Sequence, residues 1–276
     1  MTPSELPARQ ERAQYVRRMF GAVAGRYDFL NHLLSAGLDR RWRARAAAAC
    51  AEALVESRAA RPGRTAMAGE ACPGNGGLGM PPPAARAPLV LDLCCGTGDL
   101  TLAVLGRCLK ARVIACDFSP PMLERAARKF ARVACGDRTA LVEADALALP
   151  LPDASVDAVT CGFGLRNLAD AAAGLAEMRR VLRPGGPVVI LEFHQPRGRW
   201  PLAGALGLYF RRILPRLGGW ISGGGHGGYA YLVASIEAFG PPEATARTMA
   251  QAGLTAIRTE PLAGGIASVY VGLKPA

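Results

Sequence analysis

Two glycines flank a threonine directly after a short apolar run, as Gly96, Thr97 and Gly98. Because glycine lacks a side chain, such a turn lets the backbone come close to a bound ligand where a strand gives way to a helix. Asp117 ends the next apolar run, 21 residues after Gly96. A carboxylate at that place can accept hydrogen bonds from both hydroxyls of a ribose. Together, the turn and the carboxylate predict a nucleoside-binding site.

A third glycine is missing from this turn. A dinucleotide site of the same design carries glycine three residues after the second one, where it leaves room for a pyrophosphate. Thr101 occupies that position here. The sequence therefore favours a nucleoside without phosphate, of which S-adenosylmethionine is the commonest, over the dinucleotide of an NAD-dependent oxidoreductase.

Two further turns follow the third and fourth apolar runs. Asp145 and Ala146 offer a carboxylate acceptor for an adenine amino group and a backbone N–H for a ring nitrogen. Gly162 begins a turn whose small residues leave space beside a methyl donor, while Arg166 and Asn167 bring polar groups into that apolar neighbourhood. Four such turns in succession predict a methyltransferase.

These turns must be positioned by a sheet, because ligands of open parallel sheets bind beyond the carboxyl ends of the strands. From residue 88 onward, short apolar runs alternate with stretches of helical spacing. The alternation predicts an α/β fold with a doubly wound, mostly parallel seven-stranded sheet and right-handed crossovers. The expected strands are 89–95, 112–117, 140–144, 156–161, 188–192, 256–260 and 266–273, and the expected helices are 100–109, 120–133, 168–182 and 242–252.

The chain divides into three parts. Residues 1–60 are expected to form an N-terminal helical cap, since 11–57 show helical spacing throughout. Residues 61–88 contain twelve glycines and prolines among 28 residues, which predicts a flexible insertion without a core of its own. Residues 89–276 are expected to form the nucleoside-binding domain, within which 193–240 form an insertion that faces the substrate or a membrane.

The formal net charge of +11 is confined to two segments. Residues 1–64 hold twelve arginines and six acidic residues, and residues 193–228 hold five arginines and no acidic residue. Both segments also contain tyrosine, phenylalanine and tryptophan. Solvated helix faces, an anionic membrane surface and nucleic acid all fit this pattern, and charge alone does not separate them. A non-catalytic nucleic-acid-binding protein is therefore one alternative to an enzyme.

Several classes of protein are disfavoured by composition. No apolar run approaches the roughly 18 residues of a membrane span, and the N-terminus lacks a signal-peptide pattern. The eight cysteines contain no C-x-x-C pair and the three histidines are scattered. We therefore expect buried thiols in a reducing cytoplasm, with neither a disulfide framework nor a metal site.

Three stretches carry a resemblance to one family. Residues 27–42 look like its N-terminal signature, 162–167 resemble its motif after the fourth strand, and 180–193 are similar to its second signature. The family is that of the ubiquinone/menaquinone biosynthesis C-methyltransferases (UbiE/MenG), which are class I methyltransferases. The resemblance covers residues 19–275, with 61–88 as the main departure. In this family's fold, the helical cap and the 193–240 insertion are expected over the mouth of the site.

The resemblance implies methyl transfer from S-adenosyl-L-methionine to a ring carbon of a polyprenylated quinol. Demethylmenaquinol, in menaquinone biosynthesis, is the favoured substrate. The benzoquinol of ubiquinone biosynthesis and another small aromatic substrate remain alternatives. The expected cofactor contacts are Gly96, Thr97, Gly98, Asp117, Asp145, Ala146 and Gly162.

A reduced quinone is an electron-rich phenol, and partial loss of its O–H proton makes the ortho carbon nucleophilic without any metal. The protein must hold carbon, methyl and sulfur in line, which can contribute about 7–11 kcal/mol. Arg166 is the expected donor to the developing phenolate. The base is left open between a water held by Arg166 and the side chains of Tyr27, Asp28 and His32. The catalytic candidates are thus Arg166, Tyr27 and Asp28, and the substrate-binding candidates are Asn31 and Asn167.

The expected partners follow from this substrate. A long-tailed quinol resides in a bilayer, and each basic residue near an anionic surface contributes about 1 kcal/mol to binding. We therefore expect a cytoplasmic protein that lies peripherally on the inner face of the membrane and does not bind nucleic acid. The sequence leaves both a monomer and a homodimer open.

Overall fold

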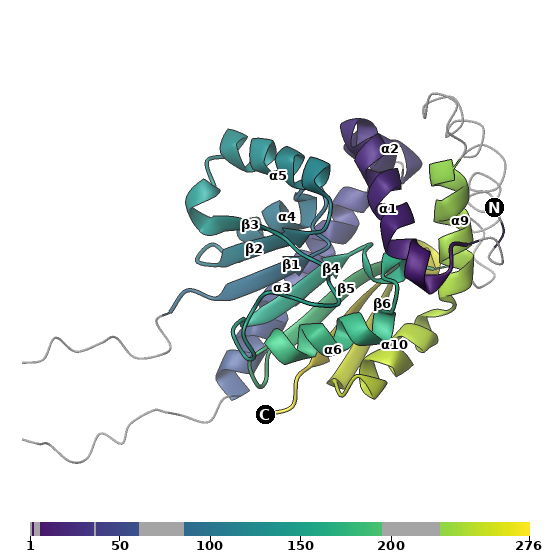
Figure 1. Ribbon diagram of the computed structural model, residues 1–276. Coiled ribbons are helices and arrows are strands. Elements are labelled where there is room, and N and C mark those ends of the chain that lie inside the picture. The colour runs from purple at the N-terminus through teal and green to yellow at the C-terminus, as the bar shows by residue number, and fades with distance from the viewer. Residues whose placement is uncertain (1, 3–5, 36, 61–85, 195–226) are drawn as a thin grey trace, which may run out of the picture.

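The computed structural model describes residue 2 and residues 6–35, 37–60, 86–194 and 227–276 (Figure 1). The predicted insertion at 61–88 lies outside the described residues except for its last three. Most of the predicted 193–240 insertion lies outside them as well. Its described end forms helix α9 (Gly227–Phe239), which the sequence analysis did not expect.

The described residues form one seven-stranded sheet with the order β3-β2-β1-β4-β5-β7-β6. The first five strands run parallel, and β7 is antiparallel to both of its neighbours. This confirms the predicted doubly wound, mostly parallel sheet. The strands are β1 (Leu89–Leu93), β2 (Arg112–Asp117), β3 (Thr139–Glu143), β4 (Ala158–Gly162), β5 (Pro187–Phe193), β6 (Thr255–Leu262) and β7 (Ala267–Leu273).

Helices cover both faces of the sheet (Figure 1). One core packs against α3 (Leu38–Ala60), α4 (Asp99–Arg107) and α5 (Pro120–Arg132), and the other packs against α6 (Ala171–Val181) and α10 (Pro242–Gln251). The central strands β4 and β5 are buried along nearly their whole length, as near-continuous apolar runs in parallel sheets require. The carboxyl ends of β1, β2 and β4 therefore meet at one edge.

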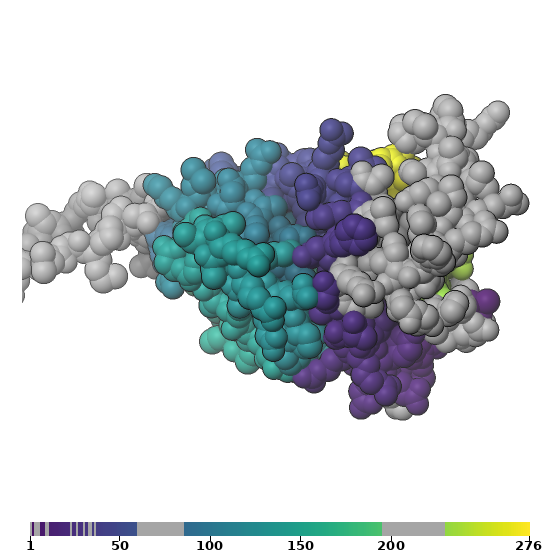
Figure 2. Space-filling view, turned by 90° about the horizontal axis from the view of Figure 1, so that it is seen from above, coloured from purple at the N-terminus to yellow at the C-terminus, as the bar shows by residue number. Residues whose placement is uncertain are grey.

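The predicted continuous helical stretch of 11–57 is broken into separate helices. Helix α1 (Arg9–Val23) passes through a 3₁₀ turn (Ala24–Arg26) into α2 (Tyr27–Leu34), and α3 follows. Gly37 adopts a φ of +77° between α2 and α3, a left-handed conformation that ends a helix. The break lets α1 and α2 turn over the sheet edge while α3 packs against the sheet, and Figure 2 shows the N-terminal segment lying against the central part of the chain.

Helix α6 begins later than the predicted 168. Asp170 caps it, since its carboxylate accepts hydrogen bonds from the N–H groups of Ala172 and Ala173. None of the helices in the described ranges combines the length and the apolarity that a membrane crossing requires.

Candidate functional site

A pocket with an empty volume of about 740 Å³, its open mouth included, lies at the carboxyl-end edge of the sheet. The turns after β1, β2, β3 and β4 and the inner faces of α1 and α2 line it. The predicted site residues on its wall are Tyr27, Gly96, Asp117, Asp145, Ala146, Gly162 and Asn167.

The turn between β1 and α4 needs its two glycines for different reasons. Gly96 has a φ of +55° and lies on the pocket wall. Gly98 has a φ of +86°, and a Cβ atom there would lie 2.5 Å from the ring of Phe130. Cys94, just before the turn, also adopts a positive φ, of 56°. Left-handed backbone at a residue other than glycine persists only where the surrounding structure imposes it, and it is common at ligand sites.

Asp117 holds the glycine turn and faces the pocket. Its Oδ2 accepts the N–H of Gly96 at 2.8 Å, and its Oδ1 accepts the N–H of Ser119 at 2.9 Å. Burial raises the pKa of Asp117, and these backbone hydrogen bonds limit the rise. Since each carboxylate oxygen can accept more than one hydrogen bond, the group keeps acceptor capacity for a pair of ribose hydroxyls.

The part of the pocket beside Asp145 and Ala146 is suited to an adenine ring. The Oδ1 of Asp145 accepts the N–H of Leu147 at 2.9 Å, which orders the turn. The walls around this turn are apolar and include side chains of α1, of the segment after β2 and of α5: Ala13, Val16, Phe20, Phe118 and Met122. The sequence analysis expected the cap over the site but named none of the three α1 residues, although their spacing marks one helix face.

Tyr27 begins α2 and reaches the cofactor turn. Its ring lies 3.9 Å from where a Cβ atom of Gly96 would be, and it meets the ring of Phe20 edge to face at 5.6 Å between centroids. Burial raises the pKa of Tyr27, although a hydrogen bond with Asn31 and the charge of Arg43 oppose that rise. The phenol is therefore protonated at neutral pH. Asn31 contacts Tyr27 and does not itself line the pocket.

Arg166 lies in the 3₁₀ turn after β4 (Leu165–Asn167), behind the pocket wall. Its Nη1 donates to Oε1 of Glu192 at 2.5 Å and to the carbonyl of Phe163 at 2.8 Å. Its backbone N–H donates to Oε2 of Glu192 at 3.1 Å. Both side chains are buried, which makes this a fully desolvated ion pair. The sequence analysis gave no role in the site to Glu192.

Asn167, by contrast, reaches the pocket wall. Its Nδ2 donates to the carbonyl of Phe163 at 3.0 Å, and its buried Oδ1 has no hydrogen-bond partner among the described residues. A buried acceptor without a partner is costly unless a ligand or water satisfies it. The amide oxygen therefore marks a place where a ligand hydroxyl would be favoured.

An aromatic layer supports this wall from behind. Phe163 stacks on Phe193 with 4.3 Å between ring centroids, and Trp42 meets both rings edge to face. The guanidinium of Arg166 lies 5.4 Å from the ring centroid of Phe193. The buried Trp42 thus belongs to the packing that fixes the Arg166 turn.

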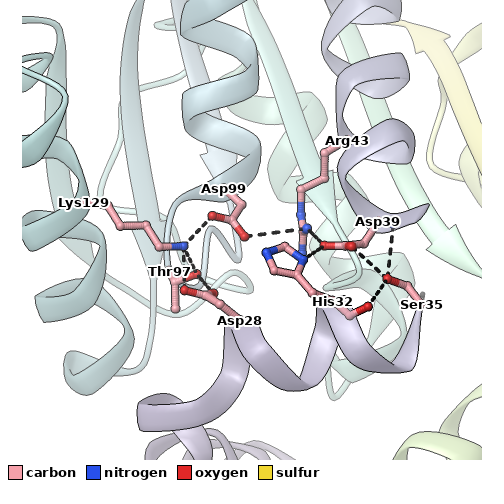
Figure 3. A network of polar contacts seen from close by, with 8 residues as sticks. All are labelled: Asp28, His32, Ser35, Asp39, Arg43, Thr97, Asp99 and Lys129. Carbon is pink, nitrogen blue, oxygen red and sulfur yellow. Dashed lines mark hydrogen bonds and ion pairs between the residues drawn. The ribbon is translucent and has the colours of Figure 1, made fainter. Parts of the chain in front are cut away.

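Asp28, Thr97 and His32 lie outside the pocket lining, in a polar network between the cap and the sheet (Figure 3). Asp28 Oδ1 accepts the hydroxyl of Thr97 at 2.5 Å, and its Oδ2 lies 2.8 Å from the ammonium of Lys129. His32 Nδ1 lies 2.7 Å from Oδ2 of Asp39. The structure thus places two of the three side chains considered as a base, Asp28 and His32, in contact with charged partners.

The sheet order, the antiparallel β7 and a pocket at the glycine turn are those of a class I S-adenosylmethionine-dependent methyltransferase. Among solved structures, the CurJ carbon methyltransferase superposes with a TM-score of 0.52 at 18% identity, over 71% of this chain and 50% of that one. The model of the ubiE/COQ5 methyltransferase family matches residues 80–274, and the chain belongs to that family. The predicted resemblance is confirmed.

Curated relatives match over nearly their full length. The demethylmenaquinone methyltransferase of Thermus thermophilus is 44% identical over 262 residues, which cover 93% of this chain and 100% of the relative. That of Deinococcus radiodurans is 42% identical over 267 residues, which cover 96% of this chain and 95% of the relative. S-adenosyl-L-methionine is the methyl donor of this class.

Proposed function

We propose that this protein methylates a ring carbon of demethylmenaquinol in menaquinone biosynthesis. The observation that carries the substrate is the near full-length similarity to two demethylmenaquinone methyltransferases. The pocket adds chemical support, because its apolar walls suit an aromatic ring, and the amide oxygen of Asn167, which has no partner in the described part of the chain, suits a hydroxyl.

The cofactor would be held by the turns at the ends of β1, β2 and β3. Asp117 would accept the ribose hydroxyls, since its carboxylate faces the pocket and keeps acceptor capacity. Asp145 and Ala146 would contact the adenine edge, and Gly96 and Gly162 would allow close approach of the backbone. When bound, S-adenosylmethionine supplies an electrophilic methyl group.

The catalytic side chains would act on the quinol hydroxyl. The quinol hydroxyl would donate a hydrogen bond to Oδ1 of Asn167 and lose its proton to water as the methyl group is transferred, and Tyr27, as a protonated phenol, would donate to an oxygen within the pocket. Arg166, whose Nη1 is bound to Glu192 and to the carbonyl of Phe163 behind the wall, would act on the site by fixing the turn that carries Asn167.

The substrate assignment is tested with purified protein and S-adenosylmethionine labelled at its methyl group. Demethylmenaquinol and the demethylated benzoquinol precursor are supplied separately, each reduced and in detergent, and products are identified by mass. We expect the label on the naphthoquinol ring, and loss of that product in Asn167→Ala. Labelling of the benzoquinol alone, or of neither lipid, would contradict the proposal.

We further propose that the basic cap lies on an anionic bilayer that holds the quinol. Helix α2 exposes 60% of Phe29, an unusual position for a large apolar side chain. Exposed arginines accompany it on α1 and at the start of α3, at Arg18, Arg40 and Arg41. An apolar side chain among cations is suited to insertion at a negatively charged interface.

Sedimentation with liposomes tests this surface. Vesicles that contain phosphatidylglycerol should pellet the protein at low salt, whereas purely zwitterionic vesicles should not. Replacing Arg40 and Arg41 by Gln should weaken binding by about 2 kcal/mol. The matched control replaces the exposed Arg107 and Arg112 by Gln. These two residues lie near the amino end of β2, at the far end of the strand from the pocket. Equal binding by both double variants would contradict a surface centred on the cap.

A further inference from the structure

We infer that Lys129 is a positioning residue, which ties helix α2 of the cap to the cofactor turn and thereby holds Tyr27 at the pocket. The inference rests on the proposed methyl transfer, since its main readout is the turnover of the quinol. Lys129 lies on α5 and is absent from the pocket lining. Its influence on the reaction therefore passes through the side chains that it binds.

The ammonium group of Lys129 bridges three elements (Figure 3). It lies 2.8 Å from Oδ2 of Asp28 on α2 and donates at 3.0 Å to Oγ1 of Thr97 in the glycine turn. It also forms an ion pair with Asp99, the first residue of α4. The Thr97 hydroxyl in turn donates to Asp28 at 2.5 Å, which closes the arrangement into a ring of contacts.

The charge balance makes this ammonium difficult to replace. Asp28 and Asp99 both contact it, so their carboxylates lie near one another and depend on the cation between them. The side chains are only 23–29% exposed, so solvent and salt screen them less than surface charges. Arg43 also approaches Asp99, at 3.6 Å, but its closer partner is Asp39. Without Lys129, repulsion between the two carboxylates would favour movement of α2 away from the turn.

The position of Tyr27 depends directly on this tether. Asp28 is its neighbour in the first turn of an eight-residue helix, and the Tyr27 ring lies against Gly96. Thr97, which shares the hydrogen-bonded ring, is the next residue after Gly96. The cap and the cofactor turn are therefore fixed to each other at the point where Tyr27 enters the pocket. Asp28, which the sequence offered as a base, is by this inference the anchor of Tyr27.

Steady-state kinetics of Lys129→Gln test the tether. We expect kcat for the quinol to fall by about ten- to hundredfold, because misplacement of a catalytic group by about 1 Å has effects of that size. The affinity for S-adenosylhomocysteine, measured by calorimetry, should stay within about twofold of the wild-type value, because substitutions that do not touch a binding site change its affinity by no more than that. Lys129→Arg should recover most of the rate. The matched control is Arg128→Gln, which removes a cation from the same helix, but at an exposed ion pair with Glu124.

A double-mutant cycle separates positioning from general destabilisation. If Lys129 acts through Tyr27, Tyr27→Phe should cost much less in the Lys129→Gln background than in the wild type. Additive losses, a wild-type kcat in Lys129→Gln, or an equal loss in Arg128→Gln would each overturn the inference.

Limited trypsin digestion gives a readout that needs no quinol. In the Lys129→Gln variant, trypsin should cleave the cap at the exposed Arg18 faster than in the Arg128→Gln variant, and mass spectrometry of the fragments identifies the cleavage sites. Should the wild type fail to methylate any quinol, the proposed function fails, and digestion still decides the tether. Equal cleavage of the two variants would overturn it.

Discussion

Glu192→Gln removes the negative charge that balances Arg166 inside the protein. The Glu192 side chain is completely buried and accepts three hydrogen bonds, from Arg166 Nη1 at 2.5 Å and from the N–H groups of Arg166 at 3.1 Å and Phe193 at 2.8 Å. Glutamine offers one acceptor oxygen and one amino group. At least one of the present donors would then face another donor.

The expected loss follows from the burial of the pair. Removing one partner of a buried ion pair costs about 3–5 kcal/mol, because the other charge is left without compensation in a medium that solvates it poorly. A typical protein has only about 5–15 kcal/mol of stability in total. The urea midpoint should therefore fall by more than about 1 M.

Urea unfolding at neutral pH, followed by circular dichroism, measures this loss. Glu260→Gln is the matched control, since Glu260 pairs with Arg45 at side-chain exposures of 43% and 34%, and it should cost less than about 1 kcal/mol. Combining Glu192→Leu with Arg166→Met should restore much of the stability, because it removes both charges. Equal losses in Glu192→Gln and Glu260→Gln would refute the reasoning.

Three other variants test separate parts of the structure. Asp117→Ala should weaken S-adenosylmethionine binding by about 1–3 kcal/mol through lost charge-assisted hydrogen bonds, and unchanged calorimetric affinity would remove it from the ribose role. Burial raises the pKa of Asp92 from 3.8 to about 6. The folded state therefore holds this proton more tightly than the unfolded chain does, and the free energy of unfolding should fall as the pH rises from about 4 to about 6. Asp92→Asn should remove this slope from urea titrations, and a variant with the wild-type slope would assign it to another group. Gly98→Ala should lower the free energy of unfolding by roughly 1–3 kcal/mol, because Gly98 has a φ of +86° and the added Cβ would lie 2.5 Å from the Phe130 ring. Gly106→Ala should not lower it, because a Cβ there meets nothing within 4 Å. Equal melting temperatures of the two variants would contradict this.

The sheet was predictable because its signals are local. Each parallel strand is a short apolar run, and the turns that follow carry the glycines and carboxylates of the pocket within a few residues of the strand end. All seven expected strands occur, with boundaries that differ by a few residues. Parallel strands place these ends at one edge, so the location of the nucleoside turns followed from the order of elements.

The cap was less predictable because its signals depend on tertiary contacts. Residues 11–57 have helical spacing on both sides of Gly37, and spacing alone does not reveal a break. The break is fixed by Ser35, whose hydroxyl donates to Asp39 at 2.8 Å, and by the approach of Arg43 to that same carboxylate. Periodicity indicates which face of a helix is apolar, but it does not indicate which other element that face will pack against.

The ion pairs of the site were beyond sequence reasoning for a related physical reason. Arg166 in the 3₁₀ turn after β4 and Glu192 in β5 are 26 residues apart, and Lys129 and Asp28 lie on helices that meet only through folding. Such partners are selected by the packing of the elements between them, and a single sequence carries no signal for that choice. Arg166 was singled out as a charged group in an apolar neighbourhood, while its neutralising partner was not.

A crystal structure of the protein with S-adenosylhomocysteine tests the central claim most directly. The account predicts the ribose hydroxyls on the carboxylate of Asp117, the adenine beside Asp145 and Ala146, and the sulfur toward Gly162 and Tyr27. The nucleoside bound at another part of the surface, or absent at saturating concentration, would contradict it.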